Sequence, residues 1–350
     1  MLFHLDISPL QLAASNRDEL TIAVQELLRA HRYGHHLIVI GRKETEWLAA
    51  ELKFHPPERA MLAEIALEYT QTAGLLQRAS RYVAIVPQPA ASNGPRIEIS
   101  LGDLKPYLLE RTALLVEDVD TDGRFYALVF QALRKALRHG PLSWELVHGG
   151  GDRLPIVFQS KVTDRRVVCA IIDSDLSAPR SEQNAKIKRL TKIATELGWP
   201  HFHVAILPCR EAENLIPLDI LAKLGSAAQR TPSIGILRSI AEAEAKKNID
   251  KLTEFWMYFD IKKGLSEPTL AALKKKERDW VQQRAKLINL DVGLTPIEGF
   301  GDKVLHQLLQ SNLACSELVK VIATKNWRDC FAGLFSELLW LCLARTPKLT

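Results

Sequence analysis

Apolar residues follow two spacings along the chain, and their alternation predicts a mixed α/β protein. Short, mostly continuous apolar runs are typical of buried strands and occur at 36–41, 82–86, 112–116, 143–148, 167–172 and 203–207. Apolar positions at helical spacing predict helices at 17–32, 44–52, 57–79, 125–138 and 184–197. Apolar strands separated by helices favour a mainly parallel, Rossmann-like sheet that is covered on both faces.

Composition changes along the chain predict three regions. The segment 87–95 (PQPAASNGP) collects residues that end regular structure, so we expect a boundary near 90–105. Beyond 265 the pattern is mostly helical, with helices expected at 271–288, 303–313, 315–323 and 327–344. We therefore expect a small α/β domain of unknown role at 1–106, a central α/β domain at 107–265 and a helical region at 266–350.

The composition is that of a globular protein with no membrane segment. Of 350 residues, 47% are hydrophobic and 25% are charged, and no apolar run approaches the roughly 20 residues of a membrane span. Five widely spaced cysteines without a C-x-x-C pair predict reduced thiols and no structural zinc. The start lacks the basic flank and cleavage site of a secretory signal. We expect a cytoplasmic protein.

The net charge of +5 is small, so the distribution of charge is more informative than its total. Two segments are rich in Lys and Arg, and either could be a solvated helix face or a surface that binds a phosphate backbone. The candidate nucleic-acid contacts are Arg180, Lys186, Lys188, Lys274 and Lys275.

Acidic residues follow three of the predicted strands. Glu117 follows TALLV, Asp173 and Asp175 follow VVCAII, and Glu211 and Glu213 follow HVAILPC. Open α/β sheets place ligands at the carboxyl ends of their strands. Carboxylates gathered there repel unless a cation offsets them, and oxygen ligands suit Mg²⁺ or Mn²⁺. Because Asp173 and Asp175 are two residues apart, an extended strand would direct both to one side. Any one acid could instead be a turn or cap residue, but three successive strands favour a divalent-metal site.

The order of these motifs resembles the Toprim domain of topoisomerases, primases and OLD-family nucleases, and most of all the OLD-like nucleases of bacterial antiphage defence. The resemblance covers about 107–265 and rests on LLVEDVDTDGRFY at 114–126, HGGGD at 148–152, IIDSD at 171–175, REAENLIP at 210–217 and FWMYFDIKKG at 255–264. The glycine that usually follows the first Glu is Asp118 here. The next acid falls at Asp122 or Asp120, on either side of its usual position.

The resemblance implies an endonuclease that hydrolyses phosphodiester bonds with two Mg²⁺ or Mn²⁺ ions. It implies that Glu117 is a general acid/base or a ligand, and that Asp173 and Asp175 are catalytic. Lys263, or its neighbour Lys262, would stabilise the developing charge. The implied metal ligands are Glu117, Asp122, Asp173, Asp175, Glu211 and Glu213.

The partners follow from the same resemblance. We expect a nucleic-acid substrate, with DNA favoured and RNA left open, because such a site reads the phosphate and not the sugar. The chain contains no G-x-x-x-x-G-K-[ST] motif, so an ATPase or sensor would be a separate protein, as in defence operons. A homo-oligomer is compatible with this arrangement.

Other interpretations remain open. The chain could be a Toprim-fold scaffold or regulatory subunit of an ATPase complex that cleaves nothing. The D-x-D at 173–175 also resembles motifs of HAD phosphatases and of glycosyltransferases. His201 and His203 could join the site, and the aromatic residues of 256–259 could stack on bases. For these last two groups, ordinary packing is the interpretation we favour.

Overall fold

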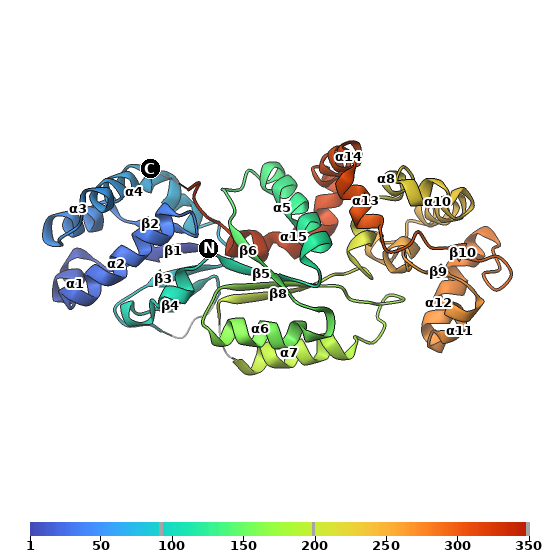
Figure 1. The fold of residues 1–350 in the computed structure, drawn as a ribbon, viewed down its shortest axis with the longest axis horizontal. Helices are drawn as coiled ribbons and strands as arrows, with labels where there is room; N and C mark the ends of the chain where they lie inside the picture. The colour runs from blue at the N-terminus through green and yellow to red at the C-terminus, as the bar shows by residue number, and fades with distance from the viewer. Residues whose placement is uncertain (91–93, 198–199, 348–350) are drawn as a thin grey trace.

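The computed structural model describes residues 1–90, 94–197 and 200–347 and contains two four-stranded parallel sheets (Figure 1). The first sheet has the order β2-β1-β3-β4, formed by β1 (Leu2–Leu5), β2 (Leu37–Ile40), β3 (Tyr82–Ile85) and β4 (Arg96–Ile99). Its helices are α1 (Pro9–Ala14), α2 (Arg17–Arg32), α3 (Arg42–Glu51) and α4 (Pro56–Leu76). Strands β1 (LFHL) and β4 (RIEI) were not predicted, because polar residues interrupt their short apolar runs, whereas β2 (LIVI) is continuously apolar. The predicted linker 87–95 includes residues 91–93, which lie outside the described residues.

The second sheet has the order β6-β5-β7-β8. Its strands are β5 (Thr112–Val116), β6 (Trp144–His148), β7 (Val168–Ile172) and β8 (Phe202–Ile206), and all neighbours pair in parallel. The chain steps from β5 outward to β6, returns to β7 and then steps outward to β8 on the other side. The direction of winding therefore reverses between β5 and β7, which is where open α/β sheets form a ligand crevice. The prediction of an α/β protein with a mainly parallel sheet is confirmed.

Helices cover both faces of the second sheet (Figure 1). Helices α6 (Leu154–Thr163) and α7 (Ala185–Leu197) pack on one face against Leu115, Ala170 and Ile172. Helices α5 (Arg124–Ala136) and α15 (Lys325–Leu341) pack on the other face. Because β5 and β7 are buried on both faces, their sequences are continuously apolar rather than alternating.

The last helix belongs to the core of the central sheet, although it was predicted within a separate helical region. Thr112 Oγ1 at the start of β5 donates a hydrogen bond to Leu341 O, at 2.6 Å. Ser143 N donates to Cys342 O at 2.8 Å. The division of the chain into three regions therefore stays a prediction. Helix α15, from the predicted third region, covers one face of the sheet in the predicted central domain.

The remaining helices lie beyond β8. They are α8 (Leu218–Leu221), α9 (Gly225–Ala228), α10 (Thr231–Lys246), α11 (Glu267–Ala272), α12 (Lys275–Ala285), α13 (Val304–Gln310) and α14 (Asn312–Ile322). An antiparallel pair, β9 (Gly264–Leu265) and β10 (Ile297–Glu298), lies among them. The helix predicted at 271–288 is interrupted, because Lys274 N donates to Glu277 Oε2 at 3.0 Å and begins a new helix. Within the described residues, no helix is long and apolar enough to cross a membrane.

Candidate active site

Three neighbouring strands of the central sheet lead to acidic residues at the same edge. Glu117 follows β5 directly and Asp173 follows β7 directly. The chain after β8 stays beside β7, because Leu207 N donates to Ile172 O at 3.0 Å, and it then reaches Glu211. The sequence predicts these residues at the carboxyl ends of strands, and the structure adds that Glu117 and Asp173 flank the reversal of winding between β5 and β7.

Asp173 occupies the centre of this acidic group. Its Oδ1 accepts a hydrogen bond from Ala212 N at 3.1 Å. Burial raises the pKa of Asp173 well above its ordinary range, and the surrounding carboxylates raise it further. Those carboxylates are Glu117, Glu213, Asp122 and Glu211. Five of the six predicted ligands therefore share one electrostatic environment.

Asp175 departs from the prediction that both aspartates of the D-x-D point to one side. The backbone turns after β7, and Asp175 adopts a left-handed conformation with φ of 54°. Asp175 N donates to Arg210 O at 2.9 Å, and the buried Ser174 hydroxyl donates to Cys209 O, so both draw the backbone toward the loop after β8. The Asp175 side chain is 53% exposed and accepts from Asn184 Nδ2 at 2.8 Å.

Two lysines neutralise part of the acidic group. Lys186 of α7 forms an ion pair with Glu117, and its side chain is only 9% exposed. Lys186 was predicted as a contact for nucleic acid; the structure turns its side chain inward to Glu117, so its contact with nucleic acid stays a prediction. Lys262 Nζ lies 2.7 Å from Glu211 Oε2 and 3.2 Å from Glu213 Oε1.

Lys262, and not Lys263, reaches the acids. Lys263 is exposed, and its backbone N–H donates to Asp260 Oδ1 at 2.8 Å in a tight turn. Adjacent residues of this turn point in different directions, so only one of the two lysines can face the carboxylates. Of the two lysines that the sequence left open, with Lys263 preferred, the structure therefore places Lys262 at the carboxylates.

Two residues that the sequence did not single out hold the acidic loop in place. Asn214 Oδ1 accepts from Glu211 N at 2.9 Å, and its Nδ2 donates to Trp256 O at 2.7 Å and Phe259 O at 3.0 Å. Arg210 pairs with Asp260 at 2.8 Å. These bonds tie the loop after β8 to the loop that carries Lys262. The sequence does contain a signal for Asn214: it lies three residues after Glu211 in REAEN, which is the spacing of a capping box.

The loops after β5 and β6 complete the edge. Asp122 Oδ2 accepts from Asp118 N at 3.0 Å, and burial raises the pKa of Asp122. In the predicted glycine turn, Gly150 has a φ of 69° and Gly149 N donates to Val116 O at 2.8 Å. A Cβ at Gly149 would lie 2.8 Å from the same carbonyl oxygen, so the turn needs glycine to pass beside Glu117.

The other predicted basic contacts are exposed. Arg180, with φ of 62°, lies in the loop between β7 and α7, and Lys275 begins α12. Lys188 and Lys274 both pair with Glu182, the latter at 3.0 Å. Glu182 therefore joins the loop after β7 to the start of α12, and four of the five predicted contacts remain on the surface.

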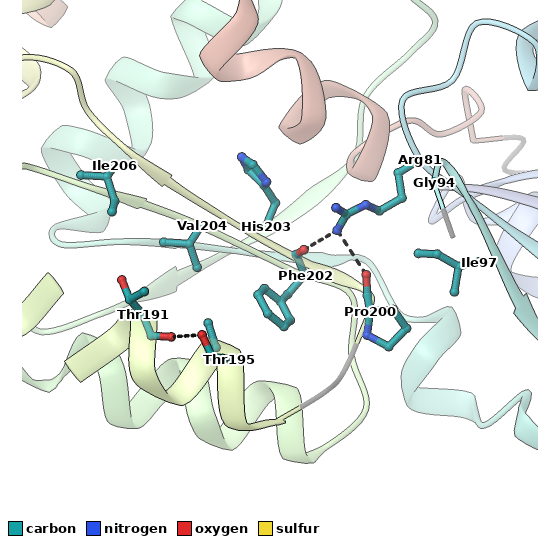
Figure 2. Close-up of a pocket in the computed structure, with 11 residues that line it drawn as sticks. Arg81, Gly94, Ile97, Thr191, Thr195, Pro200, Phe202, His203, Val204 and Ile206 are labelled. Carbon is teal, nitrogen blue, oxygen red and sulfur yellow. Dashed lines mark hydrogen bonds between the residues drawn. The ribbon is translucent and has the colours of Figure 1, made fainter. Parts of the chain in front are cut away.

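The histidines lie away from the acids. His201 and His203 are at the amino-terminal end of β8, opposite the end that leads to Glu211. His203 lines a cavity of about 580 Å³ beside β8, where Arg81 donates to Phe202 O at 2.6 Å (Figure 2). Burial lowers the pKa of His201 to about 3. Both histidines are packing residues at this end of the sheet.

The aromatic residues of 256–259 also pack inside the protein. Trp256 Nε1 donates to Asn214 O and Ile216 O, each at 3.1 Å. Tyr258 and Phe259 are buried. Their rings are therefore part of the support for the acidic loop rather than a surface on which bases could stack.

The chemistry of the acidic group fits a hard divalent cation. Within 1–90, 94–197 and 200–347, no three His, Cys, Asp or Glu side chains already form a metal-ligand group. However, four carboxylates surround that of Asp173, and among the described residues Lys186 and Lys262 are the two lysines that pair with members of this group. Glu211 Oε1 is buried and finds no hydrogen-bond partner in the part of the chain that the structure describes. Carboxylate oxygens are the ligands that Mg²⁺ and Mn²⁺ prefer.

Comparison with known proteins gives no relative: no family model matches the chain, and no match is found among curated proteins or solved structures.

Proposed function

We propose that this protein is a divalent-metal-dependent nuclease with a Toprim-like catalytic centre that hydrolyses phosphodiester bonds of DNA. One observation carries the proposal: carboxylates from three parallel strand ends meet at the point where the winding of the sheet reverses. They exceed the two lysines that pair with them, and such an excess of negative charge on buried and half-buried carboxylates favours binding a cation. The motif order described above agrees with this assignment.

The residues have distinct roles in the proposal. Glu117, Asp122, Asp173, Glu211 and Glu213 would hold Mg²⁺ or Mn²⁺. When bound, such ions lower the pKa of water and offset charge on a leaving oxygen. Asp173 is oriented by its hydrogen bond from Ala212 N, and Glu211 by its bonds through Asn214. Lys262 supplies the positive charge beside the site that the motif resemblance assigns to a lysine.

The substrate class follows from the surface beside the site. Arg180, Lys188, Lys274 and Lys275 lie on two segments that Glu182 joins, and their exposed charges suit a phosphate backbone. DNA is the proposed substrate. In the antiphage role that the motifs suggest, a separate ATPase or sensor protein would control cleavage.

The decisive experiment is a cleavage assay with DNA and with RNA, in Mg²⁺, in Mn²⁺ and in EDTA. The variants are Glu117→Gln and Asp173→Asn, and the matched control is Asp120→Asn. Asp120 lies in the same loop as Asp122, but its exposed side chain is outside the acidic group. We expect cleavage that requires metal, a loss of about 100-fold or more in the two variants and full activity in the control. Equal cleavage by all four proteins would overturn the proposal.

A second candidate function has its own support. Lys186 and Lys262 already pair with Glu117, Glu211 and Glu213, so the fold can be held together without an ion. This favours a Toprim-fold scaffold or regulatory subunit that cleaves nothing. Calorimetric titration with Mn²⁺, combined with the cleavage assay, separates the two candidates. Saturable Mn²⁺ binding without cleavage, even with a partner ATPase present, would favour the scaffold.

A further inference from the structure

A second cavity lies at the opposite edge of the central sheet from the acidic group. Its volume is about 430 Å³, and it opens where β5 and β6 begin. Strands of five residues separate the two edges by about 16 Å. The side chains that line this cavity include Arg111, Gln131, Arg134, Ser143, Trp144 and Arg345.

Among the residues that the structure describes, every charged side chain that lines the cavity is an arginine. Arg345 pairs with Glu64 and Glu68, which do not line the cavity. No described Asp or Glu side chain forms an ion pair with Arg111 or Arg134. Two guanidinium groups therefore remain to neutralise a ligand.

A neighbouring acid is already engaged elsewhere. Glu110, next to Arg111 in sequence, lies 3.9 Å from Arg29 and 3.8 Å from His35. Its side chain does not line the cavity. The carboxylate adjacent to Arg111 in sequence therefore does not neutralise Arg111.

The walls of the cavity are held by regular structure. Arg166 donates to Arg111 O at 2.6 Å, and Ser143 N donates to Cys342 O at 2.8 Å. The Trp144 ring packs edge-on against Phe130, with ring centroids 5.6 Å apart. Arg134 donates to Gln131 Oε1 at 3.3 Å, and both side chains are half-buried on α5. The sheet and α5 thus fix the backbone from which Arg111, Ser143 and Arg134 extend.

We propose that this cavity binds a phosphoryl group, carried either by a free nucleotide or by the backbone of a nucleic acid. Guanidinium groups match phosphate oxygens in charge and geometry, and the Ser143 hydroxyl and Gln131 amide add neutral donors. The Trp144 ring lies beside these donors. The site is separate from the acidic edge, so this inference does not depend on the proposed nuclease activity.

The test is calorimetric titration of the full chain in EDTA at low ionic strength, so that metal-dependent cleavage plays no part. The probes are inorganic tripolyphosphate, ATP and a short DNA duplex. The variants are Arg111→Glu and Arg134→Glu, and the control is Lys135→Glu. Lys135 is exposed in the same last turn of α5, changes the net charge equally and does not line the cavity.

We expect at least one probe to bind, and each arginine variant to weaken binding at least tenfold while the control changes it less than twofold. Binding of tripolyphosphate and ATP assigns the site to free nucleotides, and binding of the duplex alone assigns it to a nucleic-acid backbone. Absence of binding by all probes overturns the proposal, as does equal weakening in Lys135→Glu. If charge reversal unfolds the protein, Arg134→Gln makes the same test.

Discussion

The Nζ atom of Lys262 lies 2.7 Å from Oε2 of Glu211, a residue 51 positions earlier in the chain. The same ammonium lies 3.2 Å from Glu213, and both carboxylates are buried. Burial alone would lower the pKa of Lys262, but Glu213 and Glu211 outweigh it and raise that pKa. Lys262 is therefore held in its charged form between two loops of the candidate site.

Replacing Lys262 is expected to destabilise the protein strongly. Lys262→Met leaves two buried carboxylates without their cation, which costs about 3 kcal/mol in the free energy of unfolding. Lys263→Met, the matched control, changes an exposed side chain and costs less than about 0.5 kcal/mol. Urea denaturation in EDTA measures both. Equal losses in the two variants would mean that the ion pair with Glu211 is not important for stability.

Asp173→Asn is expected to have the opposite effect on stability. The substitution removes a negative charge from among four other carboxylates, while Asn Oδ1 can still accept from Ala212 N. We expect a gain of about 1 kcal/mol in metal-free protein, since sites of this kind trade stability for function. Thermal unfolding in EDTA measures the gain. The same variant should lose the increase in Tm that Mn²⁺ produces in the wild type. A variant less stable than wild type would contradict the repulsion described here.

Glu244 is expected to make stability depend on pH. This buried carboxylate of α10 accepts Phe255 N at 2.9 Å and lies 3.4 Å from Arg284. Burial raises the pKa of Glu244 to about 7, although Phe255 N and Arg284 lower it and Glu254 raises it slightly. Because the folded pKa lies above the unfolded value, the stabilising contribution is present at low pH and is lost as the pH rises through about 7.

The variant Glu244→Gln isolates this contribution, because Gln can accept the same hydrogen bond but does not titrate. From pH 5 to pH 8 the variant should gain about 2 kcal/mol relative to wild type. Urea denaturation at the two pH values measures the difference. A difference that stays constant with pH would show that Glu244 does not titrate in this range.

Asn214→Ala is expected to damage both stability and the site. The substitution removes two donors to buried carbonyls, Trp256 O and Phe259 O, and the acceptor for Glu211 N. Unsatisfied groups of this kind cost about 2–3 kcal/mol. The loop with Glu211 then loses its tie to the loop with Lys262, so Mn²⁺ affinity should fall as well. A free energy of unfolding close to that of the wild type, or an unchanged Mn²⁺ affinity, would argue against this positioning role.

Much of the architecture could be predicted from local sequence. Strands β5 and β7 are continuously apolar because both faces are covered, and their ends are marked by the acids that follow them. Strands β1 and β4 could not be predicted in this way, because His4 and Glu98 interrupt their apolar runs. The place of α15 on the central sheet was equally hidden, since no local pattern specifies which sheet a helix covers.

The sequence by itself determined which acids follow which strands, and hence that Glu117, Asp173 and Glu211 lie at one edge of a parallel sheet. Only the tertiary structure decided that Asp175 turns outward, that Lys186 turns inward and that Lys262 rather than Lys263 faces the carboxylates. The physical reason is range. Strand periodicity is set by neighbouring residues, whereas the direction of each of these side chains depends on hydrogen bonds and charges contributed by loops far away in the chain.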